Sequence, residues 1–166
     1  MPVTISKPKV KGRTSWTEKL EKEQQIKIVD IPAKMVAGCG EGTMLIATPK
    51  IILRLVQQIP RGEVTTVNII RQKLAKDYGT NTTCPMTTGI FLWIVANAMD
   101  EAKTKGAKRI APYWRVLKEG GKLNDKFPGG IKAHAEQLEA EGFMIVWNKA
   151  KTNASVFDYE RKLFTF

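Results

Sequence analysis

The chain has 166 residues, of which 43% are hydrophobic and 26% charged, so it is long enough for one domain with a buried core. Lysine and arginine outnumber aspartate and glutamate by 27 to 16, and the resulting net charge of +11 favours a polyanionic partner. Nucleic acid is the first candidate and an acidic membrane surface the second, and a soluble basic protein without such a partner is the alternative.

The scarcity of cysteine and histidine narrows the chemistry. Cys39 and Cys84 lie far apart, and His134 is the single histidine, so we expect no disulfide framework, no metal site and no cofactor. No run approaches about 18 apolar residues, and the N-terminus lacks the apolar core of a secretory signal. We therefore expect no membrane span and a cytoplasmic location.

Residues 1–47 are predicted to form a basic N-terminal arm that includes a short strand. Four of the first thirteen residues are lysine or arginine, and such tails often lie along nucleic-acid phosphates. Ser15 and Glu18 have the spacing of a capping box, which predicts a short helix at residues 16–23.

A strand and a glycine-rich stretch complete this arm. Residues 26–31 alternate well enough for a short strand, and Pro32 ends it. Residues 38–42 are rich in glycine but lack the ending of a phosphate-binding loop, so we interpret them as a turn.

Capping residues mark three helices in the middle of the chain. A threonine cap or a proline in the first turn starts a helix, and three positions have this pattern: Thr48, Thr66 and Cys84. Gly79 is the predicted stop of the second helix. The third helix ends near Gly106, and its apolar residues 90–99 must be buried.

The segment after the third helix carries two adjacent aromatic residues. Pro112 turns the chain and would present Tyr113 and Trp114 beside Arg115. Large rings next to an arginine suit stacking on bases and contact with phosphate. The alternative is that both rings belong to the hydrophobic core.

The C-terminal third is predicted to hold one helix and a hairpin. Residues 119–121 form a tight turn, and a fourth helix spans residues 131–141, where Gly142 ends it. Residues 143–147 and 155–166 are expected to be two strands, so that residues 144–166 make a C-terminal β extension.

These elements predict a mainly α fold with small β elements, in which residues 48–143 form a winged helix-turn-helix-like DNA-binding domain. A plain helical bundle is the alternative. In a helix-turn-helix the second helix enters the major groove with its N-terminal residues near base edges. Here that helix begins with four candidate contact residues: Met86, Thr87, Thr88 and Gly89.

Four motifs in order resemble those of the alkylguanine-DNA alkyltransferases. Residues 60–66 (PRGEVTT) resemble the segment that opens the helix-turn-helix, and residues 112–116 (PYWRV) resemble the active-site Pro-Cys-His-Arg-Val. Residues 127–130 (FPGG) resemble the Tyr-Ser-Gly-Gly loop, and residues 138–142 (LEAEG) resemble the closing Leu-Leu-x-x-Glu-Gly. The resemblance covers roughly residues 48–143 and implies the fold of this family.

The departures from the family pattern concern its chemistry. The positions of the alkyl-accepting cysteine and its histidine hold Tyr113 and Trp114, and of the catalytic relay only Glu141 remains. A tyrosine with a pKa near 10 is a poor nucleophile at neutral pH, so alkyl transfer by the family mechanism is not expected. Cys84 could replace the nucleophile, but it maps to the start of the DNA-reading helix.

Two further departures concern base extrusion. The family's base-flipping tyrosine corresponds to Val67, and its gap-filling arginine corresponds to Met86. A methionine can still wedge between base steps, as apolar side chains do in other DNA-binding proteins. Without both helpers, base flipping itself is in question.

The resemblance is therefore to the alkyltransferase-like branch, in which the cysteine is replaced and alkylated DNA is bound without repair. It implies a non-enzymatic protein that binds double-stranded DNA with damaged or alkylated guanine and is linked to DNA repair proteins. The implied base pocket comprises Tyr113, Trp114, Phe127, Pro128, Gly129, Gly130 and Glu141. The expected DNA contacts are Thr65, Thr66, Arg71, Met86, Thr87, Thr88, Gly89, Arg115 and Lys118.

Two other functions stay open at this point. One is a winged-helix interaction module that has lost the alkyltransferase chemistry and docks a protein or RNA. The other is an enzyme with another nucleophile, which would gain mass on incubation with alkylated DNA.

Overall fold

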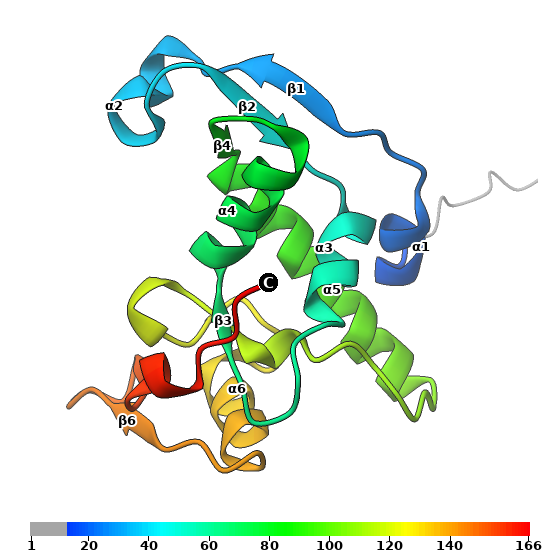
Figure 1. The fold of residues 1–166 in the computed structure, drawn as a ribbon. Helices are drawn as coiled ribbons and strands as arrows, with labels where there is room; N and C mark the ends of the chain where they lie inside the picture. Colours follow the sequence, from blue (N-terminus) through cyan, green and yellow to red (C-terminus); the bar gives the residue numbers. More distant parts are fainter. Residues whose placement is uncertain (1–12) are drawn as a thin grey trace, which may run out of the picture.

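The computed structural model describes residues 13–166, in which helices dominate and small sheets join them (Figure 1). The predicted basic tail, with Lys7, Lys9 and Lys11, lies outside the described residues. The α-helices are α1 (Trp16–Glu21), α2 (Val36–Cys39), α3 (Pro49–Val56), α4 (Val67–Tyr78), α5 (Pro85–Thr104) and α6 (Gly130–Glu139). The 3₁₀ helices are η1 (Ala33–Met35), η2 (Tyr113–Arg115), η3 (Glu119–Gly121) and η4 (Tyr159–Lys162).

The strands are short and form three small sheets. They are β1 (Lys27–Asp30), β2 (Thr43–Ile46), β3 (Thr65–Thr66), β4 (Thr82–Thr83), β5 (Val116–Leu117), β6 (Ile145–Trp147) and β7 (Ala154–Val156). In the first sheet β2 pairs antiparallel with β1 and parallel with β4. The second sheet pairs β3 with β5 in parallel, and the third pairs β6 with β7 antiparallel.

The predicted helix starts are confirmed. The hydroxyl oxygens of Thr48 and Thr66 accept hydrogen bonds from the backbone N–H groups of Ile51 in α3 and Ile69 in α4, each three residues further along the chain. Ser15 caps α1 in a full capping box. Gly79 ends α4 in the left-handed conformation. Local capping chemistry therefore places the helices that surround the candidate site.

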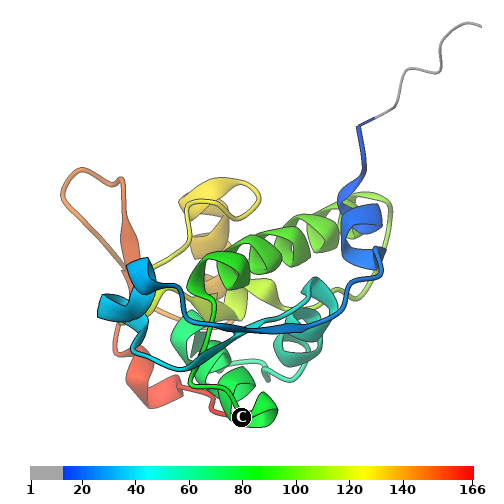
Figure 2. The ribbon, with the colours of Figure 1, turned by 90° about the horizontal axis from the view of Figure 1, so that it is seen from above.

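Helix α5 runs through the middle of the molecule, with α1 beside its C-terminal end (Figure 2). The two helices are joined at Glu101, whose carboxylate accepts hydrogen bonds from the N–H of Trp16 (3.0 Å) and the hydroxyl of Thr17 (2.8 Å). These bonds lower the pKa of Glu101 to about 2. The ring of Trp16 also meets Trp93 edge to face at 4.5 Å.

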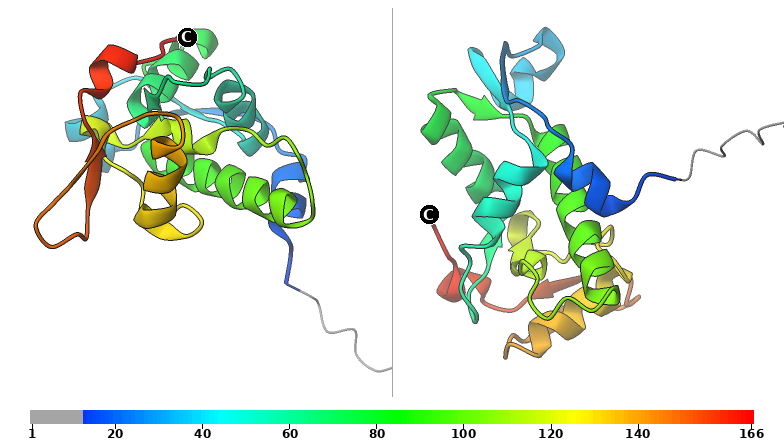
Figure 3. Two further views of the ribbon diagram at one scale, coloured as in Figure 1. Left: turned by 90° about the horizontal axis from the view of Figure 1, so that it is seen from below. Right: turned by 90° about the vertical axis from the view of Figure 1, so that its right-hand side faces the viewer.

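The core extends across the boundary that the sequence suggested at residue 47. Leu20 of α1 and Leu45 of β2 are buried in one cluster with Ile52 and Leu92. Strands β1 and β2 lie beside β4 and close one end of the molecule, and α6 and β6 lie at the other end (Figure 3). Residues 13–47 are therefore part of the folded body, and only the tail before them is left as a candidate arm.

Three segments differ from the expected elements. Helix α2 (Val36–Cys39) overlaps the start of the glycine-rich stretch that was predicted as a turn, and Gly40 ends it with φ of 78°. The fourth helix starts and ends slightly earlier than predicted. The last strand stops at Val156 because Asp158, with φ of 53°, turns the chain into η4. The C-terminus then returns to the start of β3, where the N–H of Val64 donates to Lys162 O at 2.9 Å.

Within residues 13–166, none of the helices combines the length and the apolar character needed to cross a membrane. The same residues bring together no group of three histidine, cysteine, aspartate or glutamate side chains that could hold a metal ion.

Candidate nucleic-acid interface

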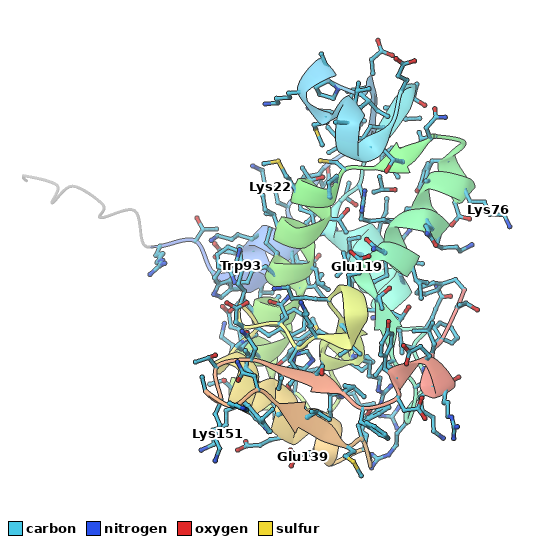
Figure 4. All side chains as sticks on the ribbon, turned by 90° about the vertical axis from the view of Figure 1, so that its left-hand side faces the viewer. Lys22, Lys76, Trp93, Glu119, Glu139 and Lys151 are labelled. Atoms are coloured by element: carbon cyan, nitrogen blue, oxygen red, sulfur yellow. The ribbon has the colours of Figure 1, made fainter. Side chains whose placement is uncertain are left out.

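A groove of about 760 Å³ lies beside the N-terminal half of α5. One wall is α5 with the start of α4, and the other is the loop that follows β5. The groove is lined by Val67, Pro85, Met86, Gly89, Ile90, Leu92, Trp93, Lys118, Glu119, Asn124 and Lys126. Figure 4 shows Trp93 and Glu119 on the same face of the molecule.

Helix α5 presents an apolar stripe to this groove. Met86, Ile90 and Trp93 follow one another at helical spacing and are 70%, 50% and 38% exposed. Large apolar side chains gathered on one surface mark binding sites in soluble proteins. The N-terminal half of α5 is therefore the leading candidate for contact with a ligand.

Gly89 lies within this stripe and has no packing role in the folded chain. A Cβ atom at this position would have nothing within 4 Å. Glycine inside a helix costs about 0.5–1 kcal/mol relative to alanine. No contact among the described residues requires a glycine here, and the position leaves the helix backbone accessible to a ligand.

The opposite wall of the groove carries lysines. Lys118 lies 3.9 Å from Asp125, and both side chains are more than half exposed, so this surface pair is weak. Lys126 is also exposed. Two cations and one carboxylate, that of Glu119, thus face an apolar stripe across one groove, which suits a ligand with both polar, charged groups and apolar surface.

His134 holds this wall in place. Its Nδ1 accepts a hydrogen bond from the N–H of Asn124 (3.0 Å), so the proton lies on Nε2, which donates to Trp114 O (2.7 Å). Burial lowers the pKa of His134 to about 4, and the imidazole is therefore neutral at pH 7. From the sequence His134 was excluded as a metal ligand, and its structural role on α6 was not predicted.

The predicted base pocket is filled by its own aromatic rings. Tyr113 and Phe127 are each only 2% exposed and pack edge to face at 5.3 Å within the core. The Tyr113 hydroxyl accepts a hydrogen bond from Gln137 Nε2 (3.3 Å), and burial raises its pKa. The alternative of a core role therefore holds for Tyr113.

The glycines of residues 127–130 are explained by the backbone. Gly129 has φ of 80°, and a Cβ there would lie 2.5 Å from the Cβ of Ala133. Gly130 follows with φ of 72° as α6 begins. Neither glycine, nor Pro128 before them, is among the residues that line the groove.

Arg115 and Glu141 form a buried ion pair, contrary to the phosphate contact predicted for Arg115. The Arg115 Nε lies 2.9 Å from Glu141 Oε1, and its Nη1 donates to Ile59 O at 2.6 Å. The side chains are 12% and 5% exposed. The pair joins η2 to the end of α6, while Trp114 and Glu141 line a separate cavity.

Several predicted DNA contacts are also internal. Thr65, Thr66 and Thr88 are buried and cannot reach a phosphate in this structure. Thr66 caps α4, and the hydroxyl of Thr88 donates to Cys84 O at 2.7 Å. Small polar residues at helix starts have this capping role in general, and the sequence alone does not separate it from ligand contact.

The remaining predicted contacts fall into two groups. Arg71 donates to Thr83 O (2.9 Å) and so ties α4 to β4, beside a small polar cavity away from the groove. Thr87 is half-buried near the start of α5. The structure brings Met86, Gly89 and Lys118 together at the groove and adds Ile90, Trp93 and Lys126, which the sequence did not single out.

Cys84, considered as a substitute nucleophile, is buried at the start of α5. Tyr113 is covered as well. Neither group presents a reactive atom at the groove.

No protein-family model matches the chain, and no curated protein sequence matches it. Among solved structures, the crystal structure of S. pombe Atl1 in complex with damaged DNA containing O6-carboxymethylguanine is similar, with a TM-score of 0.47 and 18% sequence identity. The match covers 71% of this chain and 94% of that chain. Atl1 is an alkyltransferase-like protein, the branch that the sequence motifs resemble.

Two adjacent threonines test the internal roles assigned above. The Thr65 hydroxyl is buried without a partner among the described residues, so Thr65→Val should keep or raise the free energy of unfolding, by up to about 1 kcal/mol. Thr66→Val removes the α4 cap and should lower the free energy of unfolding by about 1 kcal/mol. Urea unfolding measures both, and a marked loss for Thr65→Val would contradict the assignment.

The pKa of His134 predicts a pH dependence of stability. The folded protein holds the pKa at about 4, below the usual value of about 6.5 for histidine, so the folded state binds fewer protons between these values. Its free energy of unfolding should therefore fall by as much as about 3 kcal/mol as the pH drops from 6.5 towards 4. Urea unfolding should show that the difference in the free energy of unfolding between the wild type and His134→Asn becomes smaller over this range. A constant difference would contradict the prediction.

Proposed function

We propose that this protein binds double-stranded DNA through the groove beside α5, without covalent chemistry. The observation that carries the proposal is the first half of α5, with its exposed Met86 and uncovered Gly89 opposite the cationic Lys118 and Lys126. In this proposal α4 and α5 act as the helix-turn-helix of a winged-helix domain, and α5 enters the major groove.

Electrostatic attraction supports this orientation. The net charge of +11 draws the chain to a polyanion, and exposed lysines on the groove wall can neutralise phosphates. The N-terminus of α5 adds free backbone N–H groups and the positive end of the helix dipole. In this proposal the positive charge provides affinity for DNA, and the contacts of the groove surface provide specificity for one DNA site over another.

The apolar stripe favours alkylated guanine as the preferred site. An unmodified guanine presents O6 and N7 as acceptors in the major groove, and an O-alkyl group covers one of them with apolar atoms. Met86 and Ile90 can contact such a group directly, at the helix surface where Gly89 leaves room. In this mode the lesion is recognised within the stacked duplex, consistent with the filled space at Tyr113 and with Val67 in place of the base-flipping tyrosine.

The link to DNA repair follows from the same proposal. A protein that binds an alkylated base without removing the alkyl group can act on it only by marking it for other proteins. Repair proteins that recognise the bound complex are therefore the expected partners, as the resemblance of the sequence motifs implies.

The direct test is fluorescence anisotropy with a short duplex, with and without one O-alkylated guanine, at about 50 and about 200 mM salt. We expect tighter binding to the lesion, no gain in protein mass, and affinity that falls steeply with salt. Lys118→Gln and Lys126→Gln should each reduce the salt slope by about 0.9. Lys149→Gln and Lys151→Gln, on the loop between β6 and β7, are matched controls that should leave the slope unchanged.

Two outcomes would reject the proposal. Binding that does not change with salt would contradict phosphate contact, and no binding at either salt would contradict a DNA-binding role altogether. Equal affinity for both duplexes would retain DNA binding but remove the preference for alkylated guanine.

Gly89 provides a test that separates binding from folding. Gly89→Leu should raise the free energy of unfolding by about 0.5–1 kcal/mol, because leucine favours a helix and has space here. The same change should weaken DNA binding by roughly tenfold, equivalent to about 1.4 kcal/mol, by blocking approach to the helix. Gly38→Leu, at an equally open position in α2, should leave DNA binding unchanged, and the two variants are compared by anisotropy and urea unfolding.

A further inference from the structure

A second cavity, of about 310 Å³, lies at the other end of α5 from the groove. Its floor is apolar, with Ala107, Ile110 and Trp114 among the lining residues. Three cations, Arg61, Lys103 and Lys108, stand around it. The chain segments that form it are the turn after α3, the end of α5 with the loop that follows, and the end of α6.

The three cations at this cavity are not neutralised by ion pairs in the part of the chain that the structure describes. Among residues 13–166, none of these three cations lies within ion-pair distance of a carboxylate. Residues 1–12 contain no aspartate or glutamate that could supply one. The cavity carboxylate of Glu141 is already held by Arg115, and Arg61 is positioned at the rim by a hydrogen bond from its Nη2 to Ala140 O (3.3 Å).

We propose that this cavity is the docking site for an acidic segment of a partner protein. One apolar side chain of that segment would enter the cavity and contact Ile110 and Trp114, and its flanking carboxylates would pair with Lys103, Lys108 and Arg61. The combination of an apolar floor and a cationic rim suits a ligand that supplies both an apolar side chain and negative charge. An acidic peptide with a hydrophobic residue supplies both.

The position of the cavity allows it to act together with the groove. Met86 lies in the first turn of α5 and Lys103 in the last, 17 residues further along. At 1.5 Å per residue the two positions are about 25 Å apart along the helix axis. A partner can therefore dock at the cavity while the groove holds another ligand, and the inference does not depend on the proposed DNA binding.

The experiment uses the full chain and a fluorescein-labelled synthetic peptide with one central tryptophan between runs of glutamate. A second peptide has alanine in place of the tryptophan. Anisotropy should show that the tryptophan peptide binds roughly tenfold more tightly than the alanine peptide, a difference of about 1.4 kcal/mol. Equal affinity for the two peptides would overturn the proposal, because the apolar floor would then have no role, and so would absence of binding.

Charge variants test the location. Lys103→Glu combined with Lys108→Glu should weaken binding of the tryptophan peptide by at least roughly tenfold. Lys149→Glu combined with Lys151→Glu changes the net charge equally on an exposed loop and should have far less effect. Equal losses in the two double variants would show attraction to the overall charge alone, which overturns the proposal.

A variant that keeps every charge tests the apolar contact. Ala107→Trp, at an exposed position of the lining, should fill the cavity and weaken binding of the tryptophan peptide, while the circular dichroism spectrum of the protein stays unchanged.

Duplex DNA should bind the Lys103→Glu/Lys108→Glu variant nearly as well as the wild type. A loss of DNA affinity as large as the loss of peptide affinity would assign the cavity to a nucleic-acid surface and overturn the proposal, whereas failure of DNA binding in the wild type would reject only the function proposed for the groove.

Discussion

The two hydrogen bonds of a neutral imidazole hold the candidate interface together. His134 lies on α6, accepts from the backbone of Asn124 in the groove wall, and donates to the backbone of Trp114 in η2. Because the ring is buried, its charged form is disfavoured, and a neutral ring can both donate and accept. The loop that carries Lys118 and Lys126 is thus fixed to the core by a side chain that never meets the ligand. The position of the groove wall depends on α6, none of whose residues lines the groove.

The side chains of residues 113–115 lie in three different surroundings. Tyr113 points inward against Phe127, Trp114 lines the cavity at the end of α6, and Arg115 pairs with Glu141. Of these residues only Trp114 lines the cavity, and none of them lines the groove. The segment therefore links the core to α6 through ring packing, an ion pair and the histidine bridge.

Local signals predicted the helices well, and the site less well. Thr48, Thr66 and Gly79 mark helix ends through interactions within a few residues of the chain, so the sequence is sufficient to find them. Burial depends on distant partners, and so Arg115, Thr65 and Thr88 were assigned to a surface that they do not reach. Ile90 and Trp93 were missed for a related reason: the sequence of a long apolar helix does not indicate which of its faces is exposed. The short strands, each two to four residues, follow from tertiary pairing and carry almost no periodicity of their own.

The packing around Tyr113 has a consequence for substitutions at this position. Phe127 packs on the ring, and Gln137 donates a hydrogen bond to its hydroxyl. Tyr113→Cys would leave a cavity and an unpaired amide, with a destabilisation of about 3 kcal/mol. The identity of residue 113 is therefore coupled to that of its neighbours, and a smaller side chain would require compensating changes at Phe127 and Gln137.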